Sequence, residues 1–236
     1  MSEFSYIGTE LEVFENATNW KKYYGQHLAP YLGEEVLEVG AGIGGTTKSL
    51  CGARQTRWVC LEPDKEMTRE IEKAIAAGEL PAICEARNGS LADFNADDEK
   101  FDTIIYIDVL EHIEKDRDEL RLAARSLKSG GHLVVLSPAH QFLYTPFDKA
   151  IGHFRRYNKQ SLSQVVPEQL KRIKLLYLDS VGVFASLGNK MILQSPSPTH
   201  DQIQLWDKKL VPLSRFFDTV FRYKIGKSIL GVWQKD

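Results

Sequence analysis

The sequence predicts one α/β domain built on a doubly wound, mostly parallel sheet. Five short apolar runs of β type alternate with stretches of helical periodicity between residues 36 and 136. A glycine-rich turn follows the first run, and polar clusters follow several of the others. Such alternation is typical of parallel strands joined by crossover helices. Ligands of these sheets bind beyond the carboxyl ends of the strands.

Size and composition fit one soluble domain over residues 1–236. The chain is 43% hydrophobic and 26% charged, and its formal net charge of −2 argues against general nucleic-acid binding. Three cysteines without a CxxC pair indicate reduced thiols. The first residues do not resemble a signal peptide, and no apolar run is long enough to span a bilayer. We therefore expect a cytoplasmic protein.

The elements follow in order. A helix over 12–31 precedes the first strand and either packs on the sheet or acts as a flap through Trp20, Tyr23 or Tyr24. The following elements are expected: strand 36–39, helix 44–51, strand 57–61, helix 65–77, strand 82–86, strand 101–107, helix 115–127 and strand 132–136. Ser129-Gly130-Gly131 is expected to stop the last of these helices.

The glycine-rich turn marks a nucleotide-type cofactor site. Gly40, Gly42 and Gly45 fit the dinucleotide pattern GxGxxG, whereas Gly40, Gly42 and Gly44 fit GxGxG behind the acidic Glu38. Glu62, at the end of the second strand, suits both patterns because a carboxylate accepts hydrogen bonds from ribose hydroxyls. The turn alone therefore does not decide whether the cofactor is a dinucleotide or another nucleotide-type molecule.

The surrounding motifs resemble the class I S-adenosylmethionine-dependent methyltransferases. The matching segments are 38–44, Glu62, 88–91, 101–104, 108–112 and 127–131. The resemblance implies the Rossmann-like methyltransferase fold, with a seven-stranded sheet, an N-terminal helix and helical lid insertions. Its last two strands would be 172–179 and 228–233, the final one antiparallel between its neighbours. Residues 1–33 would form a cap helix, 34–137 the cofactor-binding core, and 138–236 the acceptor-binding loop, lid and last strands.

The resemblance also implies a cofactor-binding set. The turn would lie under the methionine part, Glu38 would orient the turn or meet the amino group, and Glu62 would hold the ribose. Ser90 stands where most relatives have an acidic residue, which weakens the expected adenine contact. The full set is Glu38, Gly40, Ala41, Gly42, Gly44, Thr46, Glu62, Pro63, Ser90, Leu91, Asp108, Val109 and His112.

The segment 138–157 is expected to bind the acceptor. It resembles the GH-x-RRY loop of a bacterial subset of these enzymes that tailors sugars, lipids and peptides in natural-product biosynthesis. A hydroxyl or ammonium acceptor needs a general base, and His153 or His140 suits that role. Tyr144 and Tyr157 are candidates to orient the acceptor or assist proton removal. One histidine, alternatively, pins the loop through Asp148 or a carbonyl.

The same segment offers groups for an anionic acceptor. Arg155 and Arg156 provide bidentate donors for a carboxylate or phosphate, with Asp148 beside them. The alternative is that one arginine pairs with Asp148 or Glu111. We expect methyl transfer to an oxygen or nitrogen of a small-molecule or peptide acceptor. The chain is expected to be a monomer or homodimer.

Two rival functions stay open. Asp108, Glu111 and His112 stand where some relatives hold a divalent metal that grips a diol, so a metal-assisted O-methyltransferase is one rival, although we expect no metal. A cofactor-binding scaffold without chemistry is the other.

The C-terminal part is expected to be mostly helical. Residues 182–193 and 201–221 have helical patterns, separated by a turn at 195–199. The basic, aromatic segment 205–227 is expected to cover the acceptor site as a lid. It alternatively contacts a membrane surface peripherally or forms a dimer contact.

Overall fold

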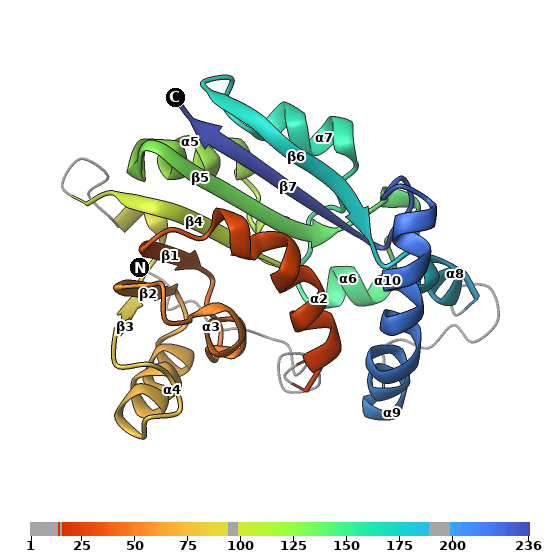
Figure 1. The fold of residues 1–236 in the computed structure, drawn as a ribbon, viewed down its shortest axis with the longest axis horizontal. Coiled ribbons are helices and arrows are strands. Elements are labelled where there is room, and N and C mark those ends of the chain that lie inside the picture. Colours follow the sequence, from red (N-terminus) through yellow and green to blue (C-terminus); the bar gives the residue numbers. More distant parts are fainter. Residues whose placement is uncertain (1–13, 15, 94–98, 189–198) are drawn as a thin grey trace.

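The computed structural model describes residues 14, 16–93, 99–188 and 199–236. They form a seven-stranded sheet with the order β3-β2-β1-β4-β5-β7-β6, in which β7 alone runs antiparallel (Figure 1). The strands are β1 (Glu35–Val39), β2 (Arg57–Glu62), β3 (Cys84–Asn88), β4 (Phe101–Ile107), β5 (Leu127–Pro138), β6 (Leu170–Leu178) and β7 (Ser228–Lys235). The predicted fold class, including the inserted last strand, is confirmed.

Alternating strand residues feed two hydrophobic clusters, one on each face of the sheet. On β1, for example, Leu37 packs with one cluster and Val36 with the other. The helices α2 (Thr18–Leu28) and α4 (Lys65–Ala76) cover one face, and α5 (Asp116–Ser126) and α7 (Lys159–Val165) cover the other. The short helix α3 (Gly45–Leu50) follows the glycine turn.

The boundaries that differ from the prediction include the start of β3 and the end of α5. Strand β3 begins at Cys84 rather than at 82, because the Cys84 N–H closes a turn onto the Pro81 carbonyl over 2.9 Å. Helix α5 ends at Ser126, before the glycine pair, so the expected stop signal at 129–131 is wrong. Strand β5 instead begins at Leu127 and contains an irregularity, since Phe101 pairs with Leu127 but Thr103 pairs with His132.

The sterics at Gly131 explain that irregularity. A Cβ at this position would lie 2.9 Å from the Lys128 carbonyl oxygen and 3.0 Å from the Asp102 carbonyl oxygen. The glycine is therefore needed where the bulged strand crosses the start of β4.

The predicted irregular loop after β5 contains two short helices. They are the 3-10 turn η4 (Gln141–Leu143) and helix α6 (Pro146–Ala150). Thr145 and Asp148 form a capping box at the start of α6, and Pro146 occupies its first turn. A bridge between Ala139 and Tyr157 closes the base of the loop.

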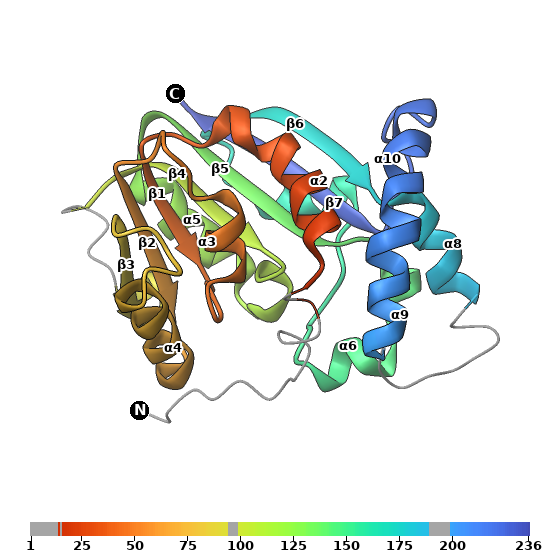
Figure 2. The same cartoon turned by 60° about the horizontal axis from the view of Figure 1, so that its bottom comes forward.

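The C-terminal helices gather beyond one end of the sheet (Figures 1 and 2). They are α8 (Ser180–Gly188), α9 (His200–Leu205), a π-helical turn η6 (Trp206–Leu210) and α10 (Val211–Val220). Most of the expected turn at 195–199 and the end of the expected helix 182–193 lie outside the described residues. Among the helices described, none is both long and apolar enough to cross a membrane.

Buried aspartates tie this helical group to the core. Asp207 of η6 accepts hydrogen bonds from the Trp20 N–H over 2.8 Å and the Asn19 N–H over 3.2 Å. It thereby caps α2, whose own N-cap residue, Ala17, offers no side-chain acceptor. Asp179, at the end of β6, accepts from Trp206 Nε1 over 2.8 Å and Ser214 Oγ over 2.6 Å.

Candidate active site

The glycine turn is shaped for close approach. Gly40, Gly42 and Gly44 have φ values of 69°, 57° and 83°, which favour glycine. A Cβ at Gly40 would lie 2.6 Å from Val109 Cγ2, at the end of β4. The turn therefore packs tightly at the carboxyl edge of the sheet, directly before the first N–H groups of α3.

Glu62 holds the turn from the neighbouring strand. Its Oε2 accepts from the Gly42 N–H over 2.8 Å and its Oε1 accepts from the Asp64 N–H over 2.9 Å. Each carboxylate oxygen keeps lone-pair capacity beyond one bond. The side chain lies at the end of β2, between the turn and the start of α4, where Pro63 is half-buried.

Glu38 lies behind the turn. Its Oε2 accepts from Thr47 Oγ1 over 2.6 Å and from Trp58 Nε1 over 2.8 Å. Burial raises the pKa of this carboxyl to about 7. Its contacts join β1 to α3 and β2, so in this structure Glu38 braces the turn.

Helix α2 contributes Lys21, a group that the sequence did not single out. Lys21 Nζ donates to the Gly45 carbonyl over 3.3 Å, and the hydroxyls of Tyr24 and Thr46 lie 3.5 Å apart. Trp20, Tyr23 and Tyr24 are buried in the core. The helix thus packs on the sheet and also brings a cation to the glycine turn. A lone lysine on a helix gives no sequence signal for this role.

The loop after β3 lies beside Glu62. The Gly89 N–H donates to the Glu62 carbonyl over 3.0 Å. Ser90 is exposed, and its hydroxyl donates to Asp93 Oδ2 over 2.8 Å, while Leu91 is buried. An acidic side chain is therefore present at this loop, three residues after the position where the family pattern places it.

Strained backbone marks the ends of β4 and β5. Asp108 and His140, the residues one and two positions past these strands, have φ values of 54° and 67°. Positive φ at non-glycine residues is uncommon and concentrates at functional sites. The Asp108 side chain is exposed, but desolvation by surrounding protein raises its pKa to about 6. A side chain that is exposed and yet desolvated by surrounding protein is expected on the floor of a cleft.

Asp148 organises the loop over residues 138–157. Its carboxylate lies 3.0 Å from His153 Nδ1 and accepts from Arg156 Nε over 2.8 Å and from Arg156 Nη2 over 3.0 Å. These partners and Thr145 hold the pKa of Asp148 well below its usual value despite burial. Arg156 therefore forms the ion pair with Asp148 that the alternative interpretation expected. Tyr144 donates its hydroxyl to the His153 carbonyl over 2.6 Å, which fixes the loop.

The remaining predicted groups of the loop point to Asp116 at the start of α5. Tyr157 donates to Asp116 Oδ2 over 2.7 Å and is buried. Arg155 donates to the same oxygen over 2.5 Å and to the Glu114 carbonyl over 2.9 Å. Both side chains thus join the loop to α5 and lie apart from the Asp148 cluster.

Lys227, just before β7, is a deep cation that the sequence did not single out. Burial lowers its pKa, and Asp108, Asp148, Asp179 and Arg156 lie within electrostatic reach. Within the described residues no carboxylate pairs with its ammonium, which lies over the Trp206 ring at 5.5 Å. His140 stands at the neighbouring strand end, tilted against Tyr177 with ring centroids 4.6 Å apart.

Glu111, His112 and His153 form a compact set of possible metal ligands. One ligand atom from each lies within 4.8 Å of the others. Glu111 is fully buried, and its Oε1 lies 3.9 Å from His153 Nε2 and has no hydrogen-bond partner among the residues described. Burial and the nearby Asp108 raise the pKa of Glu111 well above its usual value.

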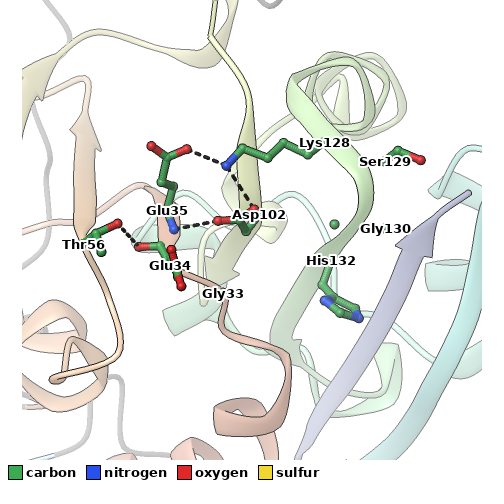
Figure 3. Close-up of a pocket in the computed structure, with 10 residues that line it drawn as sticks. Gly33, Glu34, Glu35, Thr56, Asp102, Lys128, Ser129, Gly130 and His132 are labelled. Carbon is green, nitrogen blue, oxygen red and sulfur yellow. Dashed lines mark hydrogen bonds and ion pairs between the residues drawn. The ribbon is translucent and has the colours of Figure 1, made fainter.

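A separate hollow lies at the opposite edge of the sheet (Figure 3). Lys128 there pairs with Glu35 over 2.6 Å and with Asp102 over 3.0 Å. These residues stand at the amino ends of β1 and β4, so the hollow is remote from the glycine turn. Its ion pairs join β1, β4 and β5, and we assign no ligand to it.

Comparison with known proteins places these features in a family context. Residues 37–135 match the family model described as "Methyltransferase domain". Ajmaline N-methyltransferase of Rauvolfia serpentina is 24% identical over 198 residues, which cover 84% of this chain. The match spans 61% of the length of that relative.

Solved structures share the fold at low identity. Geranyl diphosphate methyltransferase in complex with S-adenosylmethionine aligns with a TM-score of 0.65 at 10% identity, over 93% of this chain and 85% of that one. A candidate sarcosine dimethylglycine methyltransferase from Galdieria sulphuraria aligns with a TM-score of 0.62 at 15% identity, over 93% and 84%. The [4+2]-cyclase SpnF aligns with a TM-score of 0.63 at 12% identity, over 97% and 94%. The family match covers the part of the chain that holds β1 to β5, and these neighbours share the fold of the whole sheet.

Proposed function

We propose that this chain transfers a methyl group from S-adenosylmethionine to an oxygen or nitrogen of a small acceptor, with His153 as the general base. One observation supports this most: His153, which contacts the ionised carboxylate of Asp148, lies at the same edge of the sheet as the glycine turn. A methyl sulfonium is already activated, so alignment and proton removal are the tasks left to the protein.

The proposed cofactor site rests on the conformation of the glycine turn and on the residues that contact it. Gly40 packs so closely against Val109 that no Cβ fits between them, and its positive φ also favours glycine. Glu62 would accept the ribose hydroxyls, and Gly40–Gly44 would lie under the methionine part. Lys21 would pair with the methionine carboxylate, because it lies at the Gly45 carbonyl. Asp93 would take the adenine-side role that the sequence assigned to Ser90.

The base assignment rests on the tautomer that Asp148 selects. An ionised carboxylate only accepts, so His153 Nδ1 carries the proton that faces Asp148. In the tautomer with its proton on Nδ1, Nε2 is the ring nitrogen that can accept a proton, and it lies 3.9 Å from Glu111 Oε1. This is the arrangement by which a carboxylate orients a histidine base. His140 keeps the weaker claim, because its ring donates to the Gly226 carbonyl.

The acceptor is proposed to carry a carboxylate or phosphate. Arg155 is fully engaged with α5, so Lys227 and Arg156 replace the expected arginine pair. Arg156 Nη1 is buried without a hydrogen-bond partner, and Lys227 has no paired carboxylate within the part of the chain described. Two neighbouring cations with unused donors favour an anion.

A second candidate function is metal-assisted O-methylation. The unpartnered Glu111 Oε1 within the Glu111, His112 and His153 set favours it. Carboxylate and imidazole suit Mn²⁺ or Zn²⁺. This set contains His153 in place of the Asp108 expected from the sequence. A metal on His153 Nε2 would prevent that atom from acting as the base, so the two candidates exclude each other.

The test starts from labelled cofactor. The protein is incubated with S-adenosylmethionine carrying a labelled methyl group and an extract of its host, and the labelled product is identified. A labelled small molecule is expected, and its formation should survive excess chelator. Loss of activity on chelation, restored by Mn²⁺ or Zn²⁺, would favour the metal candidate. Absence of any labelled product, with cofactor binding intact, would favour the scaffold.

A further inference from the structure

Helix α10 carries its large apolar side chains on the face that points to solvent. Its buried residues are Val211, Ser214 and Asp218. The exposed ones, with their exposed fractions, are Leu213 (49%), Phe216 (63%), Phe217 (37%) and Val220 (59%). A surface helix normally has the reverse arrangement.

The buried face explains why the helix lies this way round. Asp218 accepts from the Asp179 N–H and the Ser180 N–H, each over 2.8 Å, and from the Tyr23 hydroxyl over 2.7 Å. Ser214 donates to Asp179 over 2.6 Å. Turning the stripe inward would leave these buried polar groups without partners. The loss of their hydrogen bonds would destabilise the fold more than burying the apolar side chains would stabilise it. The exposed orientation is thus built into the fold.

The four exposed residues form one stripe, here called the α10 stripe. Positions 213, 216, 217 and 220 follow the spacing that puts residues on one helical face. The rings of Phe216 and Phe217 touch edge to face, with centroids 5.3 Å apart. Helix α8 lies beside α10 (Figures 1 and 2) and also carries an exposed ring, that of Phe184, which is 59% exposed. Contiguous exposed apolar surface of this kind marks an interaction site.

Within the described segment 202–227, which contains the stripe, the exposed charges are all positive. Between residues 202 and 227 the acidic residues are Asp207 and Asp218, which are 3% and 0% exposed. The exposed cations of the same segment are Lys208, Lys209, Arg215, Arg222 and Lys224. The partner of this face is therefore expected to be anionic.

These charges favour a lipid surface over a second copy of the chain. A two-fold dimer would bring the same patch together from both subunits, and with it two sets of like charges. An anionic bilayer instead accepts apolar side chains at the acyl boundary and pairs the cations with phosphate groups. We propose that α10 docks on an anionic phospholipid membrane through the α10 stripe and its flanking cations. The proposal is independent of the acceptor chemistry argued above.

Vesicle sedimentation tests the proposal with the full chain. The protein is expected to pellet with phosphatidylcholine vesicles that contain phosphatidylglycerol, to remain free with phosphatidylcholine alone, and to dissociate as salt rises. Replacing Phe216→Ser and Val220→Ser together should weaken binding at least about tenfold. Lys208→Gln and Lys209→Gln should each weaken it by roughly fivefold.

A matched control keeps the outcome interpretable. Ile173→Ser removes an apolar side chain of β6 that is 41% exposed and lies outside the stripe, and it should leave binding unchanged. All variants should retain the thermal unfolding midpoint and the S-adenosylhomocysteine affinity of the unchanged protein. The proposal fails if the protein ignores anionic vesicles or if the stripe variants bind as before. It also fails if Phe216→Ser converts a dimer to a monomer in sedimentation velocity.

Discussion

Nδ1 of His153 lies 3.0 Å from a carboxylate oxygen of Asp148, and the opposite ring nitrogen lies 3.9 Å from the buried, unpartnered Oε1 of Glu111. One imidazole thus joins the loop over residues 138–157 to the end of β4. The loop is fixed there by a second contact, from the Phe154 N–H to the Glu111 carbonyl over 2.8 Å. This geometry gives His153 a defined tautomer and a defined position, both of which a general base requires.

Replacing the base should reduce turnover without affecting the cofactor. His153→Gln is expected to lower methyl transfer about 100- to 10,000-fold, the usual contribution of a general base. Its affinity for S-adenosylhomocysteine should stay as it is, because the ring lies beyond the glycine turn. The measurement is single-turnover transfer of labelled methyl to the acceptor identified from extract. His132→Gln, at the opposite edge of the sheet, is the control. Full turnover in His153→Gln would leave alignment alone to explain catalysis.

Removing the Asp148 charge should destabilise the protein most near neutral pH. Asp148→Asn breaks a buried ion pair with Arg156, which typically costs about 3–5 kcal/mol. The folded pKa of Asp148 is lower than its usual value, so its stabilising effect is present above roughly pH 4 and is lost as the pH falls below it. Urea unfolding of both proteins should show a stability difference that shrinks on acidification. A constant difference would contradict the depressed pKa.

Lys227 should govern acceptor affinity. Lys227→Met keeps an apolar stem beneath Trp206 but removes the deep ammonium. For an anionic acceptor we expect KM to rise about tenfold or more, with a smaller effect on kcat, because a charged hydrogen bond in the bound state is lost. Steady-state kinetics with the identified acceptor provide the measurement. Lys224→Met, an exposed neighbour, should leave KM unchanged. An unchanged KM in Lys227→Met would remove the proposed anion site.

The contribution of the Asp207 cap to the free energy of unfolding should be measurable. Asp207→Ala leaves the N–H groups of Asn19 and Trp20 without their acceptor and should cost about 1–2 kcal/mol. Because α2 carries Lys21 to the glycine turn, cofactor affinity should fall as well. Asp201→Ala, on the exposed side of α9, is the matched control. Unfolding midpoints that agree for both variants would mean that α2 does not depend on this cap.

The sequence predicts the strands and the glycine turn of residues 34–137 well, because their signals are local. Apolar runs place the strands to within a few residues, and glycines that need positive φ reveal the turn. The errors in this part occur where a contact between neighbouring strands determines where an element begins or ends, as at Gly131 in the bulged strand β5.

The part over residues 138–236 depends on partners that are distant in the chain. Asp207 caps a helix 187 residues earlier in the sequence, and Asp116 binds Tyr157 across 41 residues. No local pattern assigns such partners. The same long-range bonds hold α10 with its apolar stripe outward, against the usual expectation from amphipathic periodicity.

The central claim is that the glycine turn and Glu62 form an S-adenosylmethionine site, and isothermal calorimetry tests it most directly. The protein should bind S-adenosylhomocysteine, and Glu62→Gln should weaken binding at least about tenfold, because one acceptor for the ribose hydroxyls is lost. Glu66→Gln, which is exposed on α4, should bind like the unchanged protein. No binding by the unchanged protein, or equal binding by Glu62→Gln, would contradict the account.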